Sequence, residues 1–151
     1  MKRTVHLIAA VVATLCIATF FTTTLLVELL GSPEAIATAK RLIVSPGLFI
    51  LVPAIAITGG SGFSLSKNRK GRLVENKKKR MPFIGVNGLL VLLPCALLLD
   101  TWAASGSFGT AFYVVQGLEL IAGAVNLTLM GMNMRDGLKM TGKLRPKKSG
   151  G

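Results

Sequence analysis

A stripe of polar side chains follows one face of an otherwise apolar segment, residues 113–133, which reads YVVQGLELIAGAVNLTLMGMN. Gln116, Glu119 and Asn126 are spaced by three and seven residues, which places them on one side of an α-helix. The segment is long enough to cross a bilayer, since a spanning helix needs about 20 mostly apolar residues. A carboxyl group in hydrocarbon is energetically costly. The presence of Glu119 therefore suggests either that it exchanges a proton or that it forms a hydrogen bond that fixes the register of the helix.

The depth of Glu119 suggests a partner for its carboxyl group. Counting along the spans places Glu119 near the middle of the membrane, at a similar level to Pro53 and Pro94. Each proline is predicted to break its helix, leaving the carbonyl four residues earlier, at Phe49 or Leu90, without a donor. We expect no Lys or Arg at this depth. Glu119 is therefore predicted to be a neutral acid that donates to one of these carbonyls.

The amide side chains are interpreted as groups that join helices. Asn126 lies closer to the inner end of its span than Glu119, at about the level of Asn87 on the preceding span. A short turn joins the two spans, so we expect them to be neighbours and the two asparagines to bond to each other. Gln116 is interpreted in the same way, because amide side chains commonly bond between membrane helices.

Four long apolar stretches determine the predicted fold. They predict an all-α integral membrane protein, a four-transmembrane-helix bundle that occupies residues 1–134. We expect the first stretch to be a retained helix, because its apolar run exceeds the roughly 7–15 residues of a signal peptide. The spans cover residues of about 6–30, 42–60, 82–104 and 109–133, with a basic loop at 61–81 and a basic tail at 135–151.

The charges predict how the bundle is oriented. The 151-residue chain is 51% hydrophobic and has a formal net charge of +12. Every Lys and Arg except Lys40 and Arg41 falls in the N-terminal tip, the basic loop or the tail, which share one side of a four-span bundle. The positive-inside rule therefore predicts that both termini are cytoplasmic, and we expect a bacterial inner (cytoplasmic) membrane.

The basic loop is interpreted as a contact with anionic lipid headgroups, which attract each nearby basic residue by about 1 kcal/mol. Its basic residues lack the interleaved aromatic residues of a nucleic-acid interface, so no nucleic-acid partner is expected. These residues are Lys67, Arg69, Lys70, Arg72, Lys77, Lys78, Lys79 and Arg80. On the opposite side, Glu28 and Asp100 are predicted to form a rim of two acids, solvated or capping their helices, that could attract cations.

The other reactive residues form no catalytic or metal-ligand pattern. His6 is the single histidine, and Cys16 and Cys95 lie far apart within apolar runs. We therefore expect no bound metal, no cofactor and no enzymatic activity. A membrane enzyme or quinone-binding subunit is a third alternative, which would need polar groups that converge at one depth.

A short internal repeat bears on transport. Residues 47–57 and 88–98 share the pattern G-L-x-x-L-x-P. Because the second and third spans run in opposite directions, the repeat would be inverted across the membrane. Inverted repeats with Gly- and Pro-interrupted helices are typical of transporters.

Two functional hypotheses follow. The favoured one is a non-enzymatic assembly or accessory subunit, which forms a homo-oligomer or joins a larger membrane complex. The alternative is a small proton-coupled transporter with Glu119 as the intramembrane proton site. A water-lined cavity that reaches Glu119 would favour transport, whereas dry packing around it would favour a structural role.

Overall fold

The computed structural model describes residues 1–142, and within that range it contains helices and no strands. Four helical spans are long and apolar enough to cross a membrane. The predicted all-helical architecture with four such spans is therefore confirmed. The spans are Lys2–Leu30, Pro33–Ser66, Arg72–Ala104 and Thr110–Met140.

The first and last spans are continuous helices, whereas the two middle spans are interrupted. The first span is α1 (Lys2–Leu30) and the last is α6 (Thr110–Met140). The second consists of α2 (Pro33–Leu42), a π-helical turn η1 (Ile43–Leu48) and α3 (Phe49–Ser66). The third consists of α4 (Arg72–Asn87), a π-helical turn η2 (Gly88–Leu92) and α5 (Leu93–Ala104). The two turns fall at different positions of the G-L-x-x-L-x-P pattern, so they add no support to the repeat.

The second span begins earlier than predicted. Ser32 caps α2, with its side chain accepting a hydrogen bond from the backbone N–H of Ala35 at 3.3 Å, and Pro33 occupies the first turn. Both residues favour a helix start. The helix therefore includes Lys40 and Arg41, which the sequence analysis placed in the connection before the span.

The segment predicted as the basic loop, residues 61–81, is largely helical. α3 continues to Ser66 and α4 begins at Arg72, which leaves residues 67–71 as the connection. Gly71 closes it with a φ of 132°, a conformation that glycine adopts readily. At the other end of the chain, α6 continues through the start of the predicted tail to Met140. Residues 143–151 of the predicted tail lie outside the described residues.

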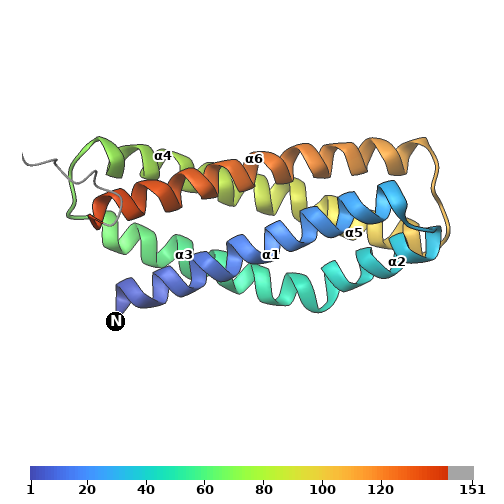
Figure 1. Ribbon diagram of the computed structural model, residues 1–151, viewed down its shortest axis with the longest axis horizontal. Coiled ribbons are helices and arrows are strands. Elements are labelled where there is room, and N and C mark those ends of the chain that lie inside the picture. Colours follow the sequence, from blue (N-terminus) through green and yellow to red (C-terminus); the bar gives the residue numbers. More distant parts are fainter. Residues whose placement is uncertain (143–151) are drawn as a thin grey trace, which may run out of the picture.

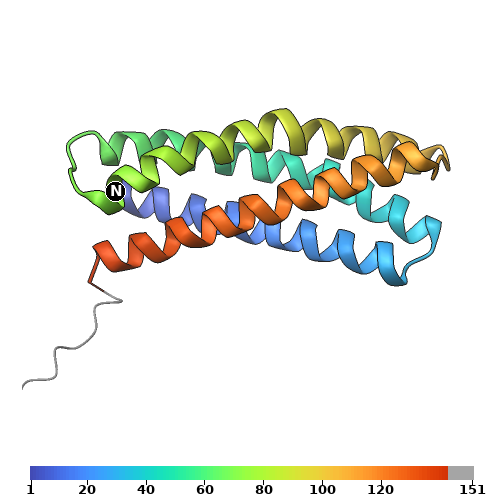
Figure 2. The ribbon, with the colours of Figure 1, turned by 90° about the horizontal axis from the view of Figure 1, so that it is seen from above.

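The spans form an antiparallel bundle. α1 packs along α3, α6 packs on α4, η2 and α5, and contacts between α1 and α6 and between α2 and α5 join the two pairs. The N-terminus, the α3–α4 connection and the end of α6 lie at one end of the bundle, and the other two connections lie at the opposite end (Figures 1 and 2). This arrangement places the basic ends of the spans together.

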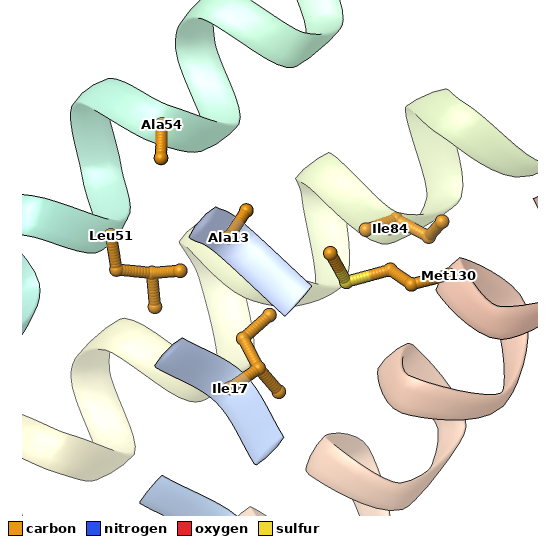
Figure 3. Packing of buried hydrophobic residues seen from close by; sticks show 6 residues of the cluster. All are labelled: Ala13, Ile17, Leu51, Ala54, Ile84 and Met130. Atoms are coloured by element: carbon orange, nitrogen blue, oxygen red, sulfur yellow. The ribbon is translucent and has the colours of Figure 1, made fainter. Parts of the chain in front are cut away.

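An apolar core within the bundle receives side chains from all four spans (Figure 3). Ala13 on α1 is fully buried, and this small residue allows the neighbouring helices to approach closely. Around it lie Ile17, Leu51, Ala54, Ile84 and Met130.

Candidate functional site: a buried ion pair beside an apolar cavity

Glu119 is bound to a lysine within the bundle. The Nζ atom of Lys40 lies 2.7 Å from Oε2 of Glu119, and the side chains are 1% and 12% exposed. The prediction that no Lys or Arg reaches the depth of Glu119 was therefore wrong. Its cause is the early start of α2, because a helix that begins at Pro33 carries Lys40 into the bundle.

Two neutral side chains complete the polar contacts of the pair. Lys40 donates to Oγ1 of Thr24 on α1 at 3.4 Å, and Nε2 of Gln116 donates to Oε2 of Glu119 at 2.9 Å. The network thus joins α1, α2 and α6. Both donors to Glu119 bond to Oε2, which leaves Oε1 for a further donor.

The predicted bond from Glu119 to a carbonyl freed by proline is absent among the described residues, since the carboxylate accepts from Lys40 and Gln116. Pro53 lies thirteen residues after Lys40 on the same span. At 1.5 Å per residue this separation is about 20 Å, so Pro53 is not at the level of Glu119. Pro94 on the third span does lie near Glu119, because its neighbours Leu93 and Ala96 line the same cavity as Glu119.

The two acids predicted to be solvated or to cap their helices at the outer rim have buried carboxylate oxygens. Asp100 is 8% exposed and its Oδ2 lies 3.4 Å from Nη1 of Arg41, so it is not the solvated group that was predicted. Glu28 interacts electrostatically with both Lys40 and Glu119. Oε1 of Glu28, Oδ1 of Asp100 and Oε1 of Gln116 are buried without a hydrogen-bond partner. Charged and polar groups from all four spans are therefore buried in the half of the bundle opposite the N-terminus.

The predicted bond between the two asparagines is confirmed. Nδ2 of Asn87 donates to Oδ1 of Asn126 at 2.9 Å, and also to the carbonyl of Ala122 at 3.0 Å. Asn126 is fully buried and donates to the carbonyl of Ile84 at 3.4 Å. These bonds join α4 to α6, as the short turn between the third and fourth spans predicted.

A second buried ion pair lies at the end of the bundle that holds the N-terminus. Nη1 of Arg80 is 2.8 Å from Oδ2 of Asp136, whose side chain is 3% exposed. Arg80, predicted to contact lipid headgroups, is thus bonded within the protein, and Lys77 is half-buried beside it. The other six predicted lipid contacts are exposed: Lys67, Arg69, Lys70, Arg72, Lys78 and Lys79.

A cavity of about 120 Å³ lies between the four spans, next to the outer ion pair. Its wall is apolar except for Thr24, Glu119 and Asn126. The cavity therefore brings together residues that the sequence analysis treated separately: the polar face of α6 and the irregular parts of the middle spans.

Sequence reasoning missed Lys40 and Asp136 as partners of buried charges. The signal for Lys40 was available in the Ser32-Pro33 pair, which marks a helix start. Asp136 gave no such signal, because its partner Arg80 lies on another span. Within residues 1–142, no group of three or more His, Cys, Asp and Glu side chains could hold a metal ion.

Comparison with models of protein families, with curated proteins and with solved structures gave no match for this chain.

Proposed function

We propose that this chain is a non-enzymatic membrane protein that acts as an assembly or accessory subunit, in a homo-oligomer or a larger membrane complex. The observation that carries the proposal is the pairing of Glu119 with Lys40 inside the bundle. A carboxylate held by a buried ammonium and by an amide stabilises a helix arrangement. Protonation of this carboxylate would remove its negative charge and leave the ammonium of Lys40 buried without a counter-charge, which is costly.

The distribution of the remaining surface supports the same role. Most of the described chain is spanning helix, and its connections are short. A partner would therefore be recognised mainly by the outer faces of the helices and by the basic ends. This is the surface that an assembly subunit offers to other membrane helices.

We further propose that both termini face the cytoplasm of a bacterial inner membrane. The N-terminus, the α3–α4 connection and the end of α6 share one end of the bundle, and the exposed lysines and arginines of that connection lie there. Their charge favours the cytoplasmic side and contact with anionic lipid.

Cysteine labelling tests this orientation. In a background with Cys16 and Cys95 replaced by alanine, Ser105→Cys should react with a membrane-impermeant maleimide in intact cells. Ser66→Cys, at the opposite end, should react only after permeabilisation. The reverse pattern would contradict the orientation.

Proton-coupled transport is the second candidate, and one observation favours it: Glu119 lines the cavity as well as pairing with Lys40. A substrate in that cavity could displace Lys40 from the carboxylate. In that case Glu119 would exchange a proton as the substrate enters or leaves.

The variant Glu119→Gln separates the two candidates, with Glu75→Gln as a matched control because Glu75 is exposed on α4. The assembly proposal predicts that Glu119→Gln lowers the thermal midpoint and the control does not. It also predicts that proteoliposomes of the wild-type protein dissipate a pH gradient no faster than empty vesicles. A normal midpoint with a loss of proton flux would support transport and refute the proposal.

Assembly itself is tested by native electrophoresis and native mass spectrometry of membranes solubilised in mild detergent. The proposal predicts that the chain migrates in a species larger than its own 15.9 kDa mass plus bound detergent. Glu119→Gln should reduce the amount of that species, while Glu75→Gln should not. A protein that is monomeric in its native membrane would contradict the assembly role.

A further inference from the structure

The cavity beside the Lys40–Glu119 pair has its most exposed lining side chains on the two middle spans, which indicates that it opens there. Val52 on α3 and Leu89 on η2 both line it, and they are 46% and 59% exposed. In a bilayer, this opening would meet lipid chains and not water. The cavity is therefore accessible to molecules dissolved in the membrane.

The carboxylate of Glu119 can accept one further hydrogen bond from a ligand in the cavity. Oε2 of Glu119 already accepts from Lys40 and Gln116, and Oε1 is left for another donor. Asn126 uses its amide groups in bonds to Asn87 and to the carbonyl of Ile84. A carboxylate oxygen is an acceptor only, so a ligand that bonds to Oε1 of Glu119 has to supply the hydrogen.

The ion pair on the cavity wall favours a neutral ligand over a charged one. The ammonium of Lys40 compensates the charge of Glu119, the one acid that lines the cavity, so a cation in the cavity would lose its hydration without an unpaired carboxylate on the wall. An anionic ligand would face the carboxylate directly. A neutral hydroxyl group satisfies Oε1 without bringing a charge into the bundle.

The size and lining of the cavity suggest a single ring. Its volume of about 120 Å³ is comparable with the ~150 Å³ of an apolar cavity that accepts benzene. Phe20 and Phe21 line it, and aromatic side chains form favourable edge and face contacts with another ring. The opening between Val52 and Leu89 gives an attached alkyl chain a route into the bilayer.

We propose that this cavity binds the ring of a neutral, membrane-dissolved alkylphenol, whose hydroxyl group donates to Oε1 of Glu119 and whose chain leaves between α3 and η2. This inference does not depend on the assembly role, because an assembly subunit and a transporter could each bind such a ligand.

The wild-type protein in phosphatidylcholine nanodiscs provides the first test. Its binding of 4-dodecylphenol and of dodecylbenzene, which lacks only the hydroxyl group, is compared by native mass spectrometry. A hydrogen bond to a charged acceptor should favour the phenol by roughly tenfold or more, with one molecule bound per chain. Equal affinities would indicate an apolar-chain site and would overturn the proposal, as would the lack of saturable binding.

A filled cavity provides the second test. Gly85 lines the cavity, and a Cβ atom there would meet no other atom within 4 Å, so Gly85→Leu places a side chain at the cavity wall without a direct clash. Gly117→Leu is the matched control, because Gly117 is equally open but does not line the cavity. Gly85→Leu should weaken phenol binding roughly tenfold, and the control should bind as the wild type does.

The thermal midpoint of each variant shows whether it is folded, and the comparison of the two ligands on the wild-type protein needs no variant. A preference for the phenol that persists in folded Gly85→Leu would place the ligand elsewhere and overturn the assignment of this cavity.

Discussion

Replacement of Lys40 by methionine tests the ion pair most directly. Methionine preserves the length of the apolar stem and removes the ammonium that lies 2.7 Å from Oε2 of Glu119. At that separation two unit charges attract by about 6 kcal/mol for an effective dielectric constant of about 20. Desolvation offsets much of this attraction, at several kcal/mol per ion.

The loss on removing one partner is larger than the net contribution of the pair, because the other charge stays buried. For a pair buried to this extent, the free energy of unfolding should fall by about 3–5 kcal/mol in Lys40→Met. Glu119→Leu should cost a similar amount, since it leaves Lys40 unpaired. The double variant leaves neither charge and should be more stable than either single variant, with a coupling energy of about 3 kcal/mol or more.

The assay is unfolding by SDS in mixed micelles, followed by the fluorescence of Trp102, the single tryptophan. Lys78→Met is the matched control, because Lys78 is exposed on α4 and its loss should change stability by less than about 0.5 kcal/mol. If the two single losses simply add in the double variant, or if each is below about 1 kcal/mol, the reasoning from a buried pair is refuted.

Three further predictions can be checked with the same unfolding assay. Asn126→Leu should lose about 1–2 kcal/mol, because it removes two of the bonds between α4 and α6 and leaves an N–H group of Asn87 without its acceptor; a stability equal to the wild type would contradict this. Asp136→Asn should lower the free energy of unfolding by about 2 kcal/mol, because it removes the charge that pairs with Arg80; an unchanged free energy of unfolding would argue against the pair. Gly47→Ala should lose about 1–3 kcal/mol, because the new Cβ atom would lie 2.6 Å from the ring of Phe20; adding Phe20→Leu should restore part of the loss, and failure to do so would exclude this clash as the cause.

Local composition was enough to predict the helices. An apolar run of about 20 residues in lipid has to satisfy its backbone bonds internally, so it forms a helix whatever lies beside it. The polar face of α6 and the bond between Asn87 and Asn126 followed from helical periodicity and a short connection. These features depend on residues close in the chain or on spans joined by a tight turn.

The pairing of the charges was decided only by the tertiary structure. Glu119 and Lys40 are far apart in sequence and lie on helices that are not joined directly, so their contact depends on where α2 begins and which face it turns inward. The same holds for Arg80 and Asp136, and for the cavity that gathers residues from every span. Hydropathy places a residue inside or outside the membrane, but an ion pair within it depends on depth and rotation, and packing between helices determines both.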